Sequence, residues 1–306
     1  MQKRKLGQSS VEVSVVGLGC NNFGRRMHDI APIRAVVYRA LDLGVTLFDT
    51  ADIYGENGKS EQFLGELLGP RRRDVVLATK FGYGGGASRS SVMRSAEASL
   101  KRLRTDWIDL YQVHFPDTRT PAEETMRALD DLVRQGKVRQ IGCSNYSVSQ
   151  VSAAMTASEQ HGLARFVTCQ DEYSLLARDI ETDLVPHMQR HGLSLLPYRP
   201  VANGLLTGKY QRGKPMPKGT RLSTSGRHAS DVVNERNWGI VEQVQNLASR
   251  SGRNMLEIAF GWLLSKPVTA SVIAGATSPE QVEQNVRAGS ITLSPTEVAE
   301  LDRMSA

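Results

Sequence analysis

The sequence predicts an α/β protein that folds as a (β/α)8 TIM barrel, and three observations support this fold class. Eight short apolar runs recur along the 306 residues, helical patterns separate them, and each run is rich in Val, Ile, Leu or Phe. Such runs are typical of strands buried on both faces of a parallel sheet. Eight repeats favour a barrel, because a doubly wound sheet usually has about five or six strands. No linker shows a shift in composition, so we expect a single domain over residues 1–306.

The eight predicted strands are each too short for a normal helix and are bounded by turn residues. They are Val15–Cys20, Thr46–Thr50, Val75–Lys80, Ile108–His114, Val138–Ser144, Phe166–Gln170, Leu193–Tyr198 and Ala270–Gly275. Several helical patterns between them carry an N-cap serine, a first-turn proline or a glycine just after the last turn, which mark helix ends. These helices are Ala31–Leu43, Ser60–Leu68, Pro121–Arg134 and Ser278–Ala288.

Elements outside the repeat are also predicted. Before the first unit, Arg4–Leu6 and Val11–Val13 indicate an N-terminal β-hairpin that closes the barrel floor. Three further helices exceed the repeat, two of them between strands seven and eight and one at the C-terminus: Val232–Arg250, Met255–Leu264 and Pro295–Met304. The stretch Ala202–Ser230 has no clear helix or strand. A loop of that length inside a compact domain is usually a lid or binding loop.

Composition and charge exclude several classes of protein. Lys+Arg number 38 and Asp+Glu 32, and the net charge of +6 is scattered; its densest run, Arg71–Arg73, has no interleaved aromatics. We therefore expect no nucleic-acid partner. The three cysteines Cys20, Cys143 and Cys169 form no CxxC, which excludes a disulfide framework or zinc site and fits a reducing cytoplasm. No apolar stretch approaches the roughly 18 residues of a membrane span, and Glu12 interrupts any signal peptide.

Polar residues at the ends of predicted strands two to four indicate proton donation to a carbonyl. Active sites of such barrels lie at the carboxyl ends of the strands, where Asp49, Tyr54, Lys80 and His114 fall. An ammonium beside a phenol favours the phenolate, so we expect Lys80 to lower the pKa of Tyr54 toward neutrality. Asp49 would pair with Lys80 and limit its desolvation cost. His114 would hydrogen-bond the substrate oxygen. No metal-ligand spacing is present.

The sequence resembles the aldo-keto reductase family in segments that follow the family's order from the first hairpin to the last helix. The matching segments are Gly17–Gly19, Phe48–Gly55, Ala78–Lys80, Gln112–His114, Ile141–Tyr146, Glu172–Leu176, Gly204–Lys209 and Ala274–Gln281. The last segment is similar to the bacterial, potassium-channel-β-subunit-like branch rather than to the animal aldose reductases.

The resemblance implies an NADPH-dependent oxidoreductase that reduces an aldehyde or ketone reversibly. It makes Asp49, Tyr54, Lys80 and His114 the catalytic tetrad, with Tyr54 as general acid. The implied cofactor contacts are Cys20, Asn21, Asp49, Ser144, Asn145, Gln170, Tyr198, Arg199, Pro200, Gly204, Leu205, Lys209, Arg221, Gly275, Thr277, Gln281, Gln284 and Asn285. Among them, Ser144, Asn145 and Gln170 would hold the nicotinamide carboxamide, and Tyr198 would stack on its ring.

Cofactor preference and substrate are less closely defined. Arg221 resembles the arginine that meets the 2′-phosphate, which favours NADPH, but Gly275 replaces a phosphate-binding lysine of the animal branch, so NADH stays possible. The expected specificity loops are Phe23–His28, Phe81–Ser90, Phe115–Thr120 and Ala202–Ser230. Their arginines could attract a negatively charged small-molecule carbonyl substrate; they include Arg25, Arg26, Arg89 and Arg119. Oligomeric state is not predicted.

Two other function classes stay open at this point. The channel-β-like branch makes a nucleotide-binding regulatory subunit with little turnover conceivable, although no partner-docking segment stands out in the sequence. A metal-dependent barrel hydrolase using Asp49 and His114 would lose activity with chelators, but it lacks a complete ligand set.

Overall fold

The computed structural model of the protein describes residues 1–84, 86–224 and 232–306. Its main sheet has eight strands in the order β10-β3-β4-β5-β6-β7-β8-β9, and every neighbouring pair is parallel. The strands are β3 (Val16–Gly19), β4 (Leu47–Asp49), β5 (Val76–Phe81), β6 (Ile108–Val113), β7 (Val138–Ser144), β8 (Phe166–Gln170), β9 (Ser194–Leu195) and β10 (Val272–Gly275). Nearly all of their residues are buried, as the continuous apolar runs predict.

Backbone hydrogen bonds join the two ends of this sheet. The N–H of Leu195 donates to Val268 O at 2.7 Å, and the N–H of Ala270 donates back to Leu195 O at 3.0 Å. Farther along, the N–H of Ile273 in β10 donates to Pro197 O at 3.1 Å. The sheet therefore closes into a barrel, which confirms the predicted fold class.

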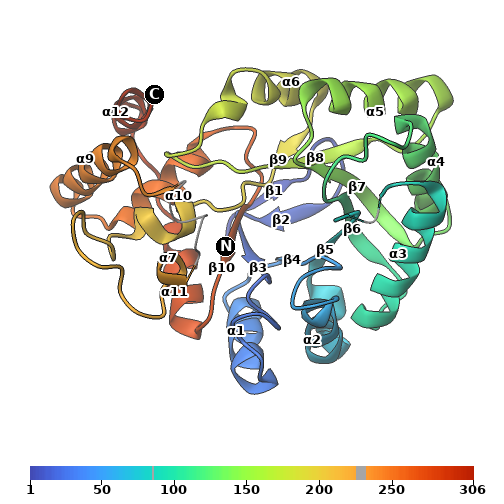
Figure 1. The fold of residues 1–306 in the computed structure, drawn as a ribbon, viewed down its shortest axis with the longest axis horizontal. Coiled ribbons are helices and arrows are strands. Elements are labelled where there is room, and N and C mark those ends of the chain that lie inside the picture. Colours follow the sequence, from blue (N-terminus) through green and yellow to red (C-terminus); the bar gives the residue numbers. More distant parts are fainter. Residues whose placement is uncertain (85, 225–231) are drawn as a thin grey trace.

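Helices alternate with the strands and surround them on the outside (Figure 1). The first six are α1 (Ile30–Asp42), α2 (Lys59–Leu68), α3 (Arg89–Leu103), α4 (Ala122–Arg134), α5 (Val148–His161) and α6 (Leu184–His191). Local chemistry fixes their ends: α5 begins at a capping box of Ser147 and Gln150 and ends at Gly162, which has a φ of 60°. Short 3-10 helices over Gly69–Asp74 and Asp179–Glu181 extend two of the connections.

The C-terminal third carries the remaining long helices, which gather on one side of the barrel (Figure 1). They are α9 (Glu235–Ser251), α10 (Met255–Ser265), α11 (Pro279–Ala288) and α12 (Pro295–Met304). Of the two helices expected as additions between strands seven and eight, α10 is largely buried and packs against β10 and α11. It therefore holds the repeat's seventh position, while α9 and α12, which contact each other, are additional.

The predicted N-terminal hairpin is present and closes one end of the barrel. Its strands are β1 (Lys3–Lys5) and β2 (Glu12–Ser14), paired antiparallel. Leu6 and Val13 are fully buried with residues from the barrel interior: Leu47, Ala78, Leu110, Leu196, Ala270 and Ile273. Gly7 has a φ of 54°, and a Cβ there would lie 2.5 Å from Val167 O. Because the hairpin covers the amino ends of the strands, the carboxyl ends remain for a site.

Strand seven is shorter than predicted. The sequence indicates Leu193–Tyr198, but regular pairing covers only Ser194–Leu195. Pro197 has no N–H to donate, so the ladder is interrupted there and resumes as an isolated bridge at Tyr198.

The long loop after strand seven is more ordered than its composition predicts. Within Ala202–Ser230, the structure has a 3-10 helix over Ala202–Thr207 and the short helix α7 (Arg221–Thr224), so the expectation of no helix is wrong. The first of these accommodates positive φ angles at Ala202, Asn203 and Gly204. Residues 225–230 of this loop, and Gly85 of the loop Phe81–Ser90, lie outside the described residues.

Candidate active site

The four residues of the predicted tetrad lie at the carboxyl ends of three adjacent strands. Asp49 is the last residue of β4, Lys80 lies near the end of β5, and His114 directly follows β6. Tyr54 lies in the turn between β4 and α2. Because neighbouring strands run in the same direction, their carboxyl ends lie at one end of the barrel, and the strand register brings these side chains together there.

Lys80 and Asp49 form a buried ion pair at the centre of the site. Lys80 Nζ donates to Asp49 Oδ1 at 2.9 Å, to Asp49 Oδ2 at 2.8 Å and to Thr50 O at 2.8 Å. Burial by itself lowers the pKa of Lys80, but the charges of Asp49 and Tyr54 outweigh it and the net pKa is raised. The ammonium is therefore retained at neutral pH, as predicted.

Tyr54 lies beside this ion pair, with Lys80 Nζ 4.9 Å from the centroid of its ring. Burial raises the pKa of Tyr54, and the opposing effects of Lys80 and of hydrogen bonding with Asn21 do not overcome it. The expectation that Lys80 brings this pKa toward neutrality is therefore wrong. The main reason is the burial of the phenol, and the charge of Asp49 raises its pKa further. Tyr54 is consequently protonated at neutral pH and able to donate.

His114 faces Tyr54 edge-on, with 5.8 Å between the ring centroids and 80° between the planes. Burial and the charge of Lys80 lower the pKa of His114 to about 3. The imidazole is thus neutral over the physiological range. Its Nδ1 is buried and has no hydrogen-bond partner among the described residues. A neutral ring in this position can hydrogen-bond an oxygen placed beside the phenol.

A second group of predicted residues is hydrogen-bonded to the first. Gln170 Nε2 donates to Asp49 Oδ1 at 2.9 Å, and Asn145 Nδ2 donates to His114 O at 3.0 Å. The Tyr198 hydroxyl donates to Asn145 Oδ1 at 2.7 Å. Asn145, with a φ of 60°, is held in a left-handed conformation that asparagine tolerates. The structure therefore brings the expected carboxamide-binding residues and the stacking tyrosine together beside the tetrad.

Two acidic residues support this group and were not predicted. Asp171 is 6% exposed, and burial raises its pKa to about 7 against the lowering effect of the Asn145 backbone, whose N–H donates to Gln170 O at 3.3 Å. Glu172 Oε2 accepts from Arg199 Nη1 at 2.9 Å. Both acids directly follow the strand run that ends at Gln170, so their position at a strand end was the available signal.

Cationic residues surround the loop after β9. Gly204 has a φ of 97°, and a Cβ there would lie 2.8 Å from Lys209 Nζ, so glycine leaves room for that lysine. The pKa of Arg221 is lowered by burial and by the charges of Arg199, Arg25 and Arg26. Cations gathered against their own repulsion form a surface that suits an anion such as phosphate.

The remaining predicted cofactor residues fall into two sets. At the end of β10, Gly275 is exposed, and the N–H of Thr277 donates to Gln281 Oε1 at 2.8 Å at the start of α11, the helix that also carries Gln284 and Asn285. Cys20, Leu205 and Pro200 are buried. The Cys20 thiol has no exposed surface, while its neighbour Asn21 is half-buried and reaches Tyr54.

This set of residues fits a nicotinamide dinucleotide. The Asn145 amide accepts a hydrogen bond from the hydroxyl of the half-buried Tyr198, and the Gln170 amide bonds Asp49. This combination of amides and an aromatic ring suits a planar carboxamide-bearing ring. The cations Lys209 and Arg221 lie on the loop that follows, where phosphates would be neutralised.

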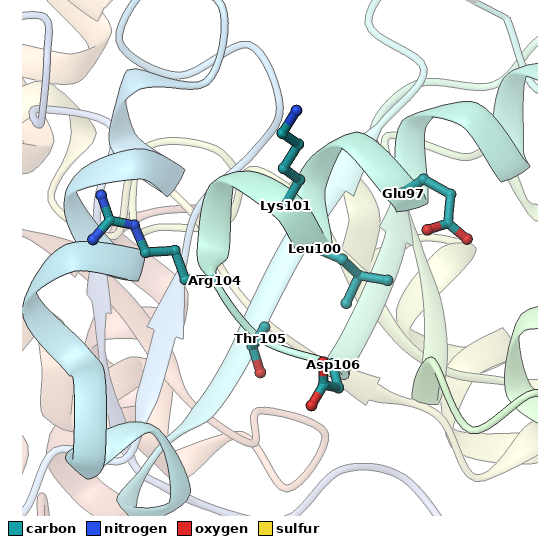
Figure 2. Close-up of a pocket in the computed structure, with 6 residues that line it drawn as sticks. All are labelled: Glu97, Leu100, Lys101, Arg104, Thr105 and Asp106. Carbon is teal, nitrogen blue, oxygen red and sulfur yellow. The ribbon is translucent and has the colours of Figure 1, made fainter.

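A hollow in the surface of the structure lies away from these residues. Figure 2 shows Glu97, Leu100, Lys101 and Arg104 at the end of α3, followed by Thr105 and Asp106. These residues precede β6 and therefore lie at the amino end of that strand, opposite the tetrad. Within residues 1–84, 86–224 and 232–306, no group of three or more His, Cys, Asp or Glu side chains could hold a metal ion. No helix in these ranges has the length and apolar character needed to cross a membrane.

Comparison with known proteins agrees with this geometry. The sequence profile of the Aldo/keto reductase family matches residues 15–306. The chain belongs to the aldo/keto reductase family. This confirms the resemblance seen in the motifs and makes the chain a member of an oxidoreductase family whose members generally use NAD(P)H.

Relatives in this family are named for different functions. The chain is 33% identical over 306 residues to a probable voltage-gated potassium channel subunit beta of Arabidopsis thaliana, covering 94% of this chain and 91% of that protein. It is 32% identical over 322 residues to the L-glyceraldehyde 3-phosphate reductase of Escherichia coli strain K12, and the match covers 99% of this chain and 92% of that protein. It is 34% identical over 310 residues to an uncharacterized oxidoreductase of Bacillus subtilis, covering 96% and 92%.

Proposed function

We propose that this protein is an NADPH-dependent reductase that converts an aldehyde or ketone to the alcohol in a reversible reaction. The observation that carries the proposal is the buried Lys80–Asp49 pair beside Tyr54, at hydrogen-bond distances of 2.8 and 2.9 Å. Gln170 joins this pair to the residues suited to a nicotinamide ring, so proton donor and hydride site would meet at one substrate.

The residues divide the chemistry as follows. NADPH, when bound, supplies a hydride from its nicotinamide C4 to the carbonyl carbon. Tyr54 gives its phenolic proton to the carbonyl oxygen, and Lys80 stabilises the resulting phenolate by its charge. His114, neutral because its pKa is about 3, hydrogen-bonds the same oxygen and orients the carbonyl. The phenolate then recovers a proton from water.

The cofactor contacts in this proposal are those that the family resemblance implies. Ser144, Asn145 and Gln170 would hold the carboxamide, and Tyr198 would stack on the nicotinamide. Lys209 and Arg221 would bind phosphates, and a 2′-phosphate at Arg221 supports NADPH over NADH. Gly275 offers no cation there, so NADH remains a usable cofactor at lower affinity.

The test is turnover of NADPH with 4-nitrobenzaldehyde, followed by nicotinamide absorbance, in wild type and in Tyr54→Phe. Removing the proton donor should lower kcat by about 10²–10⁴-fold, the usual contribution of general acid catalysis. NADPH affinity should stay within a few-fold. Tyr38→Phe makes the same chemical change on α1, away from the site, and should turn over like wild type. Wild-type turnover in Tyr54→Phe would contradict the mechanism.

A second candidate function is a dinucleotide-binding regulatory subunit with little turnover. The observation that favours it is the 33% identity to the protein named as a probable potassium channel subunit beta. In the assay above, this function predicts tight NADPH binding without aldehyde-dependent oxidation. A panel of aldehydes and ketones would separate the two functions.

We also propose the cytoplasm as the compartment. Cys20, Cys143 and Cys169 are free thiols in the structure. Cys143 Sγ and Cys169 Sγ lie 3.7 Å apart in neighbouring strands, and a reducing compartment would keep them reduced.

A further inference from the structure

The four rim arginines named from the sequence fall into two classes. Arg89 pairs with Asp131, and Arg119 Nε pairs with Asp117 Oδ1 at 3.4 Å. Arg25 and Arg26 are exposed, and no carboxylate in the described part of the chain lies within ion-pair distance of either. The first two charges are compensated within the protein, whereas the second two are available to a ligand.

Arg25 and Arg26 lie on a turn that the backbone holds in place. The N–H groups of Arg25, Arg26 and Met27 all donate to Asn22 O, at 3.2, 2.9 and 3.0 Å. Asn22 is itself buried, and its Nδ2 donates to Ala276 O at 3.3 Å, which ties the turn to the segment after β10. The backbone that carries the two guanidinium groups is therefore fixed relative to the barrel.

A single side chain separates Arg25 from the proton donor. Arg25 Nη1 donates to Asn21 Oδ1 at 3.4 Å, and Asn21 lies close enough to Tyr54 to lower the pKa of its phenol. A substrate whose carbonyl lies at Tyr54 would thus have Arg25 within reach of its other end.

The surrounding charges add to the positive field at this place. Arg26 Nη2 donates to Gly219 O at 2.5 Å, which brings the segment before Arg221 close to the turn. Arg199 contributes further positive charge, part of which Glu172 offsets, and Arg221 lies near enough to Arg25 and Arg26 for their charges to lower its pKa. A cleft lined by one sign of charge raises the local concentration of oppositely charged ligands.

We propose that the carbonyl substrate carries an anionic group, a carboxylate or a phosphate, and that Arg25 binds this group with Arg26 beside it. The inference rests on the proposed function and specifies its substrate class. Arginine suits the role because its guanidinium binds both groups through two parallel hydrogen bonds. Arg199 directly follows Tyr198, and Arg199 and Arg221 are residues that the family resemblance assigns to the cofactor.

The test compares two aldehydes of the same shape and different charge, 4-carboxybenzaldehyde and 4-nitrobenzaldehyde. Wild type should show a kcat/KM about tenfold or more higher for the carboxylate, as expected for a charged hydrogen-bonded contact. Arg25→Gln should lower this ratio about tenfold, through KM of the anionic aldehyde. The matched control is Arg119→Gln, which removes the same charge from the same rim and should leave the ratio within about twofold, because Asp117 already compensates that arginine.

Further experiments distinguish a carboxylate from a phosphate as the anionic group, and distinguish failure of the anion site from failure of the proposed reductase function. Glyceraldehyde 3-phosphate compared with glyceraldehyde shows whether phosphate or carboxylate gains more from Arg25. Calorimetric binding of 4-(hydroxymethyl)benzoate to the NADP⁺-loaded protein reports on the anion site without turnover. If no carbonyl compound is reduced but this binding weakens in Arg25→Gln, the proposed function fails and the anion site stands.

Three results would overturn the inference while leaving the reductase intact. The first is reduction of both aldehydes with equal kcat/KM in wild type. The second is an equal loss of the preference for 4-carboxybenzaldehyde in Arg119→Gln, which would show that the overall positive charge of the rim, and not a contact with Arg25, causes the preference. The third is a weakened NADPH Kd in Arg25→Gln with an unchanged aldehyde ratio, which would assign Arg25 to the cofactor.

Discussion

Replacement of Lys80 by methionine tests the central ion pair, because methionine keeps the length of the side chain and removes its charge. The change deletes three hydrogen bonds from Nζ, two to Asp49 and one to Thr50 O. Lys80 is fully buried and Asp49 is 3% exposed, so water does not replace the lost partner. Gln170 Nε2 remains as a donor to Asp49 at 2.9 Å.

Removing one partner of a buried ion pair typically costs about 3–5 kcal/mol, because an uncompensated charge stays in the interior. We expect Lys80→Met to lose stability in this range. The loss should be larger at pH 8 than at pH 5, because an unpaired buried carboxylate gains stability when it takes up a proton. Combining it with Asp49→Asn removes the stranded charge, so the double variant should be more stable than Lys80→Met alone.

The measurements are urea and thermal unfolding followed by circular dichroism at both pH values. Lys101→Met is the matched control: Lys101 is exposed on α3, as the close-up in Figure 2 shows, and its loss should change stability by less than about 0.5 kcal/mol. A Lys80→Met protein as stable as this control, or a double variant no better than the single one, would refute the buried-pair argument.

Two further predictions concern pH. Burial and Lys80 lower the pKa of His114 from 6.5 to about 3, so the unfolded chain binds an extra proton between these values and stability falls as the pH drops. In His114→Gln, the free energy of unfolding should depend less on pH in this window, by up to about 1.4 kcal/mol per pH unit. If the variant and wild type lost stability in parallel as the pH falls, the lowered pKa of His114 would be contradicted. Burial raises the pKa of Asp171 from 3.8 to about 7, so this group costs stability as the pH rises through that window. Asp171→Asn, which keeps an oxygen acceptor beside the Asn145 backbone, should therefore gain stability over wild type at pH 8 more than at pH 5; an equal gain at both values would disprove the shift.

Some local details could be predicted because their causes are local. The run Val138–Ser144 matches β7 residue for residue, since it is too short for a normal helix and is bounded by turn residues at Gly136 and Asn145. The helix over Pro295–Met304 was likewise predicted with its bounds, since Ser294 and Glu297 form a capping box around its first turn. Strand seven was overextended, because an apolar run does not show that Pro197 interrupts the ladder.

In the candidate site, too, some features could be predicted from the sequence and others depended on the tertiary structure. The sequence could place Asp49, Tyr54 and Lys80 at adjacent strand ends, since strand order in a barrel follows chain order. It could not give the sign of the shift in the pKa of Tyr54, which depends on how deeply the phenol is buried and on how far Asp49 offsets Lys80. The position of Asp171 at a strand end was visible in the sequence, but its raised pKa depends on how deeply the folded chain buries the carboxyl group.

The amino-acid sequence by itself determined the barrel repeat, the closing hairpin and the residue types at the strand ends, because periodicity and helix-end signals act over a few residues. Tertiary structure decided which charges compensate one another. Arg89 and Arg25 are both arginines of predicted rim loops, yet only Arg89 has a carboxylate, that of Asp131 on α4, within reach among the described residues. Electrostatic energy depends on distance and burial, and neither quantity exists until distant segments have packed together.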